Sequence, residues 1–219
     1  MARNLIFDLD GTLVDSKQTC IAILQEMLDE RSSGTKIDTD IAVVYMSSGG
    51  QQMVQALLGD ACGDPELELR EFRERYANRQ TPTEALFAGV ASGLQELHAA
   101  GHRLAVCSNK PHKLCNKVLD DTRLSHLFEI VVGGQAGMRP KPAPDLMKAV
   151  LDALGDPNDN CIYIGDSEID DAVARNAGLA FCFMTYGYGK PERISPDARS
   201  FDHFGLLVDA LLAHPEALT

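Results

Sequence analysis

Apolar residues fall into short runs along this chain, and segments with a helical pattern separate them. Five runs are rich in Leu, Ile, Val and Phe and lack clean polar alternation, which is typical of strands buried on both faces. These predicted strands are residues 5–9, 103–108, 129–132, 161–164 and 180–184. Four predicted helices lie between them, at residues 90–100, 111–119, 144–154 and 170–177. Strands that alternate with helices predict an α/β fold, with a Rossmann-like parallel sheet and helices on both of its faces.

Residues 16–81 interrupt this alternation with three successive helical patterns and no convincing strand. The three patterns lie at residues 20–32, 49–59 and 66–80. A segment of about 65 residues is longer than ordinary connections within α/β units. We therefore expect a helical cap domain, residues 16–81, inserted into a core domain formed by residues 1–15 and 82–219. The alternative is that these helices simply pack against the sheet.

Aspartates cluster where the first and fourth predicted strands end. Asp8 and Asp10 are two residues apart, so they face the same side of an extended strand. Asp166 and Asp170 follow the strand at 161–164. Ligands of open α/β sheets bind at the carboxyl ends of the strands, where these side chains converge if the two strands are neighbours. Like charges at such short range would take up protons unless a cation lies among them.

Oxygen ligands without His or Cys suit a hard cation, Mg²⁺ or Ca²⁺. Few protein ligands and open solvent positions favour Mg²⁺ acting together with a substrate phosphate. Each residue alone has a simpler explanation, since Asp166 and Ser167 are good helix N-caps and Asp8 could be a buried, hydrogen-bonded aspartate. Together these explanations would require several costly buried charges at strand ends. We therefore expect a Mg²⁺ site.

A phosphate-binding site is predicted next to these carboxylates. Ser108 and Asn109 end a strand just before a helix begins, so they supply a hydroxyl, an amide and free backbone N–H groups. Lys141 lies in the segment RPKPAPD, whose prolines stiffen the chain and suit a lysine held at one position. A solvated loop lysine is the ordinary alternative. An anionic substrate requires such a local positive charge, because the net charge of the 219 residues is −12.

The composition argues against other partners and compartments. An acidic surface repels nucleic acids and anionic membranes, so neither is expected as a partner. The six cysteines form no C-x-x-C pair, and three lie in apolar runs, as in a protein with reduced thiols. No apolar stretch reaches the length of a membrane span, and the first strand follows without the apolar region of a signal peptide. We therefore expect a cytoplasmic protein.

Four short motifs occur in order along the chain. They are DLDGT at 8–12, Ser108-Asn109 after a strand, Lys141 in a K-P-x-P segment, and GDSEID at 165–170. Over the whole chain, they resemble the four motifs of the haloacid dehalogenase superfamily. The helical insertion, GTLVDS at 11–16, SNKP at 108–111 and NAG at 176–178 are similar to its phosphoglycolate phosphatase-like subgroup. Threonine is often found there at the position of Ser108, which keeps the hydroxyl.

The resemblance implies a Mg²⁺-dependent phosphatase, which is a phosphoric monoester hydrolase. Asp8 would attack the phosphorus of a small phosphate monoester and become an aspartyl-phosphate. Asp10 would protonate the leaving alcohol and then activate the hydrolytic water. Dehalogenases of the superfamily lack an aspartate at the position of Asp10, so dehalogenation is not expected. A protein that only binds a phosphometabolite or a partner protein is the non-catalytic alternative, and it would have no need for Asp10.

The remaining motif residues are implied as ligands. Ser108 and Lys141 would hold the transferring phosphoryl group. Mg²⁺ would be held by a set of oxygens: Asp8, the backbone carbonyl of Asp10, and Asp166, with Asp170 as support. The resemblance makes 2-phosphoglycolate the leading substrate. Sugar phosphates, nucleoside monophosphates and pyrophosphate stay open, as does a phosphoglucomutase-like reaction on the same core.

The cap is expected to close over the site and contact the leaving group. Residues 46–52 form the expected contact loop, in which Ser48, Gly49 and Gly50 permit close approach of the backbone. A plain interhelical turn is an equal alternative. A cap cation should meet the carboxylate of 2-phosphoglycolate, and the candidates are Lys36, Arg70, Arg73, Arg75 and Arg79, with Lys17 and Lys190 near the mouth of the site. A monomer or a homodimer is expected.

Overall fold

The computed structural model describes residues 2–46, 49–155 and 158–213. The chain divides into two compact units. Met1–Asp15 and Pro82–Thr219 form one of them, called the core unit below, and Ser16–Thr81 forms the other, called the helical unit. No helix in the described ranges is long and apolar enough to cross a bilayer.

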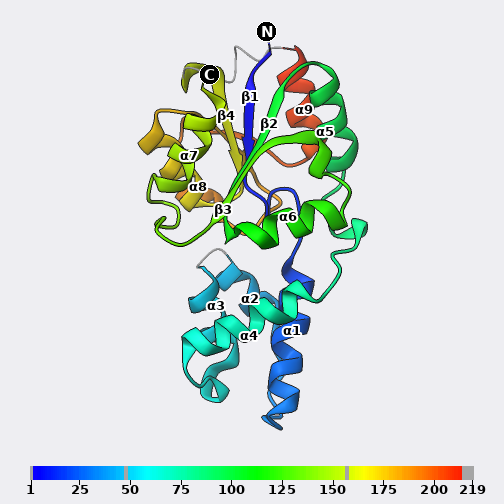
Figure 1. The fold of residues 1–219 in the computed structure, drawn as a ribbon, viewed down its shortest axis with the longest axis vertical. Helices are drawn as coiled ribbons and strands as arrows, with labels where there is room; N and C mark the ends of the chain where they lie inside the picture. Colours follow the sequence, from blue (N-terminus) through cyan, green and yellow to red (C-terminus); the bar gives the residue numbers. More distant parts are fainter. Residues whose placement is uncertain (1, 47–48, 156–157, 214–219) are drawn as a thin grey trace. The chain divides into compact units, whose positions relative to one another are not determined.

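A parallel sheet forms the centre of the core unit (Figure 1). Its strands are β1 (Asn4–Phe7), β2 (Arg103–Pro111), β3 (Phe128–Gly134), β4 (Cys161–Gly165), β5 (Ala180–Met184) and β6 (Arg199–Phe201). The strand order is β3-β2-β1-β4-β5-β6, and every neighbouring pair is parallel. The predicted α/β fold with a Rossmann-like sheet is confirmed. β1 lies between β2 and β4, so the strands that carry the predicted site residues are neighbours.

Helices cover both faces of this sheet. They are α5 (Val90–Ala99), α6 (His112–Asp121), α7 (Asp145–Leu154), α8 (Glu168–Ala177) and α9 (Phe204–Ala213). α7 and α8 pack on one face, where Ile6, Cys107 and Tyr163 join their buried side chains. On the other face Phe7 packs against Phe204 of α9, with ring centroids 6.1 Å apart. Figure 1 shows α5 and α9 together on one side of the sheet and α7 and α8 on the other.

The five predicted strands and four predicted helices of the core are present, with ends shifted by a few residues. Two core elements were not predicted. β6 is only three residues long and begins with Arg199 and Ser200, so it has no apolar run. α9 is apolar almost throughout, FGLLVDALLA, and therefore lacks the polar face that marks an amphipathic helix in a sequence.

The helical unit contains α1 (Lys17–Glu30), α2 (Thr39–Met46), α3 (Gly50–Leu58) and α4 (Pro65–Ala77), and its described residues form no strand. α2 was not predicted, because it is short and its middle is β-branched. α4 begins after Asp64, whose side chain accepts hydrogen bonds from the backbone N–H groups of Glu66 and Leu67. Arg31 donates two hydrogen bonds to the buried Glu68, at 2.8 and 2.6 Å, and so ties the end of α1 to α4.

Candidate active site

Three adjacent strands bring the predicted site residues to one edge of the sheet. Asp8 and Asp166 directly follow β1 and β4, and Ser108 lies in β2 on the other side of β1. All three residues are buried. The backbone N–H of Asp8 donates to the carbonyl of Ile164 at 2.9 Å, which continues the pairing of β1 with β4 and keeps Asp8 beside Asp166. This is the edge at which ligands bind in open α/β sheets.

Asp8, Asp166 and Asp170 form a buried carboxylate cluster, with oxygens within 4.8 Å of one another. Burial raises the pKa of Asp8 to about 6, while Lys141 lowers this pKa and Asp170 raises it. Burial also raises the pKa of Asp166 well above its ordinary value, and the charges of Asp170 and Asp8 add to the effect. Keeping this cluster ionised is therefore costly, and a divalent cation among the oxygens would offset the cost.

The carboxylate of Asp170 is fully engaged by the protein. Its Oδ1 accepts hydrogen bonds from Lys141 Nζ at 2.7 Å and from the Tyr163 hydroxyl at 2.8 Å. Its Oδ2 accepts from the backbone N–H of Ser167 at 3.1 Å and from the Ser167 hydroxyl at 2.6 Å. A carboxylate offers about four acceptor positions. Asp170 therefore has no acceptor position left for a cation. It contributes to the site through its hydrogen bonds with Lys141, Tyr163 and Ser167.

Asp8 and Asp166 keep free acceptor positions. Asp8 Oδ1 is buried and accepts no hydrogen bond within the described ranges, although it lies 3.0 Å from Lys141 Nζ. Asp166 accepts one hydrogen bond on each oxygen, from Thr12 Oγ1 at 3.0 Å and from the backbone N–H of Tyr188 at 2.7 Å. Two carboxylates with unused lone pairs and no softer donor fit a hard cation such as Mg²⁺.

Glycines allow the chain to pack directly against Asp166. A Cβ atom at Gly11 would lie 2.3 Å from Asp166 Oδ2, and one at Gly187 would lie 2.2 Å from Asp166 Cβ. A Cβ atom at Gly189 would lie 2.1 Å from the Asp166 carbonyl oxygen. The turn after β1 and the loop after β5 therefore fix the position of this carboxylate through contacts that no larger residue could make.

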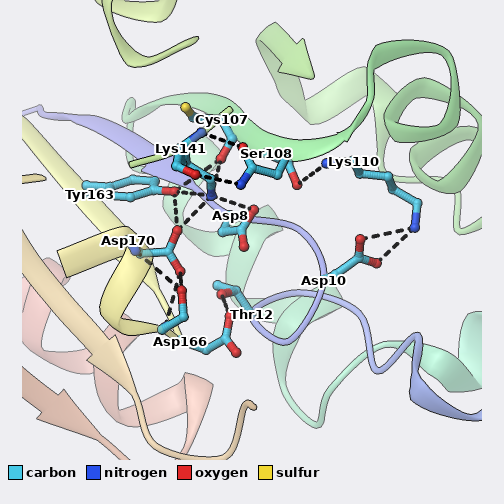
Figure 2. Close-up of polar contacts among 12 residues, drawn as sticks. Asp8, Asp10, Thr12, Cys107, Ser108, Lys110, Lys141, Tyr163, Asp166 and Asp170 are labelled. Carbon is cyan, nitrogen blue, oxygen red and sulfur yellow. Dashed lines mark hydrogen bonds and ion pairs between the residues drawn. The ribbon is translucent and has the colours of Figure 1, made fainter. Parts of the chain in front are cut away.

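Lys141 supplies the positive charge of the site (Figure 2). Its ammonium group is buried and lies within 3.1 Å of four oxygens: Tyr163 Oη and Asp170 Oδ1 at 2.7 Å, Asp8 Oδ1 at 3.0 Å, and the Cys107 carbonyl at 3.1 Å. Burial by itself would lower the pKa of Lys141, but the charges of Asp170 and Asp8 raise it above its ordinary value. The amine therefore stays protonated next to Asp8.

Ser108 and Asn109 have different surroundings. Ser108 is buried, and its Oγ accepts a hydrogen bond from the backbone N–H of Lys110 at 3.3 Å, which leaves the hydroxyl proton for another acceptor. Asn109 Oδ1 accepts from the backbone N–H of Lys141 at 2.7 Å, and Asn109 Nδ2 donates to the Lys141 carbonyl at 3.1 Å. The Asn109 side chain, predicted as a phosphate ligand, is thus engaged in holding the backbone of Lys141.

Asp10 lies apart from the carboxylate cluster and pairs with Lys110. Both of its oxygens are 3.0 Å from Lys110 Nζ, and only 7% of the Lys110 side chain is exposed. Figure 2 shows Asp10 turned toward Lys110, while Asp8 and Asp170 lie beside Lys141. Lys110 and Tyr163 were not predicted as site residues. The position of Lys110 in SNKP, directly after Ser108 and Asn109, was the available signal.

The cap residues predicted to contact substrate lie in the helical unit. Ser48 is outside the described residues. Gly49 has a φ of 94° and precedes α3, and Gly50 is the first residue of that helix. Three of the five predicted cap cations pair with carboxylates of the same unit: Lys36 with Asp29, Arg75 with Glu30 and Glu71, and Arg79 with Glu26. Within the described ranges, the side chains of Arg70 and Arg73 form no hydrogen bond or ion pair.

Comparisons with known proteins show which family the chain belongs to. A family model described as haloacid dehalogenase-like hydrolase matches residues 5–184. The chain is 34% identical over 212 residues to a phosphoglycolate phosphatase of Rhodobacter capsulatus, covering 94% of this chain and 95% of that protein. It is 31% identical over 222 residues to a plasmid-encoded phosphoglycolate phosphatase of Cupriavidus necator, covering 98% and 92%. The crystal structure of a predicted phosphoglycolate phosphatase from Haemophilus somnus superimposes with a TM-score of 0.81 at 25% identity, covering 95% and 97%.

The α/β core with its parallel sheet is that of the haloacid dehalogenase-like hydrolases, and the chain belongs to this family. Within that family it is an enzyme of the phosphoric monoester hydrolase class. The family and the enzyme class predicted from the motifs are confirmed.

Proposed function

We propose that the protein is a Mg²⁺-dependent phosphatase that transfers a phosphoryl group from a small phosphate monoester to Asp8 and then to water. The observation that carries this proposal is the state of the Asp8 carboxylate. Its Oδ1 is buried, accepts no hydrogen bond within the described ranges and lies 3.0 Å from the Lys141 ammonium. A carboxylate oxygen with unused lone pairs is a suitable nucleophile, and the ammonium beside it would offset the charge of the phosphate it attacks.

The reaction proceeds in two displacements at phosphorus. In the first, an oxygen of Asp8 forms a bond to phosphorus, the bond from phosphorus to the ester oxygen breaks, and the Asp10 carboxyl gives its proton to the leaving alkoxide. In the second, Asp10 takes a proton from water as the water oxygen bonds to phosphorus. The bond between phosphorus and Asp8 then breaks, which releases inorganic phosphate and restores Asp8.

Asp8, Asp166 and the backbone carbonyl of Asp10 would hold Mg²⁺. When bound, the cation neutralises charge on Asp8 and on the phosphoryl oxygens. Lys141, whose ammonium lies 3.0 Å from Asp8 Oδ1, would offset the negative charge of the phosphoryl group. The hydroxyl of Ser108 donates to a phosphoryl oxygen, and Asn109 keeps the backbone of Lys141 in place.

The helical unit acts as a cap domain that selects the leaving group, and 2-phosphoglycolate is the proposed substrate. Support comes from the two phosphoglycolate phosphatases to which the chain is 34% and 31% identical. In this proposal the cations that meet the substrate carboxylate are Arg70 and Arg73, whose side chains have no carboxylate partner within the described ranges. The same proposal includes contacts between the leaving group of the substrate and the backbone at Gly49 and Gly50.

A panel of phosphorylated metabolites tests the proposed function. Phosphate release would be measured for 2-phosphoglycolate, sugar phosphates, nucleoside monophosphates and pyrophosphate, each with Mg²⁺ and with a chelator. The expected result is Mg²⁺-dependent hydrolysis with the highest kcat/KM for 2-phosphoglycolate. A higher kcat/KM for another compound of the panel would make that compound the proposed substrate in place of 2-phosphoglycolate. An isomerised sugar phosphate as the main product would favour a mutase. Hydrolysis of no member would refute the phosphatase itself.

A further inference from the structure

Tyr163 places a hydroxyl group inside the site from the middle of β4. Its side chain is fully buried, and its ring packs against Phe181 with centroids 6.0 Å apart. The hydroxyl oxygen lies 2.7 Å from Lys141 Nζ, 2.8 Å from Asp170 Oδ1 and 3.1 Å from the Cys107 carbonyl oxygen. The Tyr163 hydroxyl thus contacts three polar groups of the site, which come from β2, from α8 and from the segment before α7.

The strand itself gives no reason for a hydroxyl at this position. The neighbouring residues of β4, Ile162 and Ile164, are apolar and fully buried. A buried hydroxyl costs free energy unless it is hydrogen-bonded, and phenylalanine would fill the same space without that cost. Burial raises the pKa of Tyr163 well above its ordinary value, so the phenol keeps its proton. It can therefore accept from Lys141 and donate to Asp170 or to the Cys107 carbonyl.

The Tyr163 hydroxyl is one of the four oxygen neighbours that surround the Lys141 ammonium. A lysine ends in a point charge on a flexible four-carbon stem, so its place is set by the groups around it. Two of its four oxygen neighbours are the carboxylates of Asp8 and Asp170, which attract it from different directions. Tyr163 is the neutral side chain among the four, and at 2.7 Å it is as near as Asp170. Removing it would let the ammonium move between the two carboxylates.

We propose that Tyr163 is a positioning residue for phosphoryl transfer, whose hydroxyl fixes the Lys141 ammonium at the distance from Asp8 that the transferring phosphoryl group requires. This proposal rests on the function proposed above, because it assigns Lys141 to the phosphoryl group. Tyr163 itself touches neither the substrate nor the cation. Its effect reaches the reaction through Lys141 and through the shared hydrogen bond to Asp170.

Tyr163→Phe tests the role because it removes only the hydroxyl. Hydrogen bonds to charged groups contribute enough that kcat should fall roughly tenfold, whereas KM should change by about threefold or less. Orthovanadate, which mimics the five-coordinate phosphorus of the transition state, should inhibit the variant roughly tenfold more weakly. Tyr76→Phe is the matched control, since Tyr76 is also a fully buried tyrosine but belongs to α4 of the helical unit. It should keep the wild-type kcat and vanadate inhibition.

A double-mutant cycle with Lys141→Met shows whether Tyr163 acts through the lysine. Without the ammonium the hydroxyl has nothing to position, so adding Tyr163→Phe should lower kcat by about twofold or less. An equal tenfold loss in both backgrounds would overturn the proposal, as would a Tyr163→Phe enzyme with wild-type kcat and vanadate inhibition. Thermal unfolding would show whether Tyr163→Phe folds. A variant that does not fold would overturn the proposal, because the hydroxyl would then serve the stability of the fold. Inactive wild-type protein would refute the proposed function, whereas an active enzyme unaffected by Tyr163→Phe refutes the positioning role alone.

Discussion

Asp8 and Asp166 are buried carboxylates whose ionised forms are stabilised only in part by their surroundings. Thr12 and the backbone of Tyr188 donate to Asp166, and Lys141 lies beside Asp8. Burial still raises both pKa values, and the pKa of Asp8 reaches about 6. At the scale of the residue, the site therefore has an excess of negative charge that a bound cation would relieve.

The pH dependence of Mg²⁺ binding follows from the raised pKa of Asp8. In the folded protein this carboxyl takes up a proton near pH 6, whereas its ordinary pKa is 3.8. The destabilisation of the metal-free protein is fully present above pH 6 and is relieved as the pH falls through 6 toward 4, because the folded state binds the proton first. Mg²⁺ requires the ionised carboxylate. We expect the rise in Tm on adding Mg²⁺ to be full at pH 8 and to fade below pH 6, as measured by thermal unfolding across this range.

Two variants serve as controls for this measurement. Asp166→Asn removes a proposed ligand and should abolish the Mg²⁺-induced rise in Tm at every pH. Asp171→Asn removes a buried carboxylate outside the cluster, one that accepts from the backbone and hydroxyl of Ser195 at 3.2 and 2.8 Å, and should keep the rise. A rise that persists in Asp166→Asn would contradict the assignment of this site.

The strands and loops position the site residues because they end at the same edge of the sheet. The loop after β5 is an example, because Gly187 and Gly189 pack against Asp166 and the backbone of Tyr188 donates to it. Gly187→Ala would place a Cβ atom 2.2 Å from Asp166 Cβ. Such overpacking should lower the free energy of unfolding by about 1–3 kcal/mol. It should also weaken Mg²⁺ binding, which titration calorimetry would measure. Unchanged stability and Mg²⁺ affinity would show that this loop does not fix Asp166.

The strand ends explain how far the sequence could predict the site. Asp8, Asp166 and Ser108 were predictable, because parallel strands end at one edge and each residue interrupts or follows an apolar run. Lys110 directly follows Ser108 and Asn109 in the SNKP segment, which marks it as a residue near the site, but no local pattern shows that its side chain reaches Asp10. Tyr163 was hidden within an apolar strand, where an aromatic residue looks like part of the core. The bonding of Asn109 to the backbone of Lys141 depends on a contact between distant segments, which spacing along the chain does not show.

At the scale of the whole molecule, two compact units divide the work in the proposed function. The core unit carries the reacting groups, and the helical unit selects the leaving group. The helical unit holds Arg75 and Arg79 in ion pairs with Glu30, Glu71 and Glu26, which leaves Arg70 and Arg73 as cations without a carboxylate partner within the described ranges. The selectivity of the enzyme for the shape and charge of its substrate is thus expected to depend on residues that the four motifs do not include.

The substrate prediction concerns these two arginines. If 2-phosphoglycolate is the substrate, Arg70→Gln or Arg73→Gln should raise its KM roughly tenfold, because a charge-assisted hydrogen bond to the carboxylate is lost. The kcat/KM for p-nitrophenyl phosphate, which has no carboxylate, should stay unchanged. Lys36→Gln is the control, since Lys36 is exposed and paired with Asp29. Wild-type KM values in both arginine variants would contradict the proposed contact.

The covalent intermediate on Asp8 tests the central claim most directly. Wild-type protein and Asp8→Asn would each be mixed with 2-phosphoglycolate and Mg²⁺, quenched in acid within milliseconds and examined by mass spectrometry of the peptide that contains residue 8. The account predicts one added phosphoryl group on Asp8 of the wild-type protein, with neither the adduct nor phosphate release in Asp8→Asn. Phosphate release that persists in Asp8→Asn, or a phosphoryl group found on another residue, would contradict it.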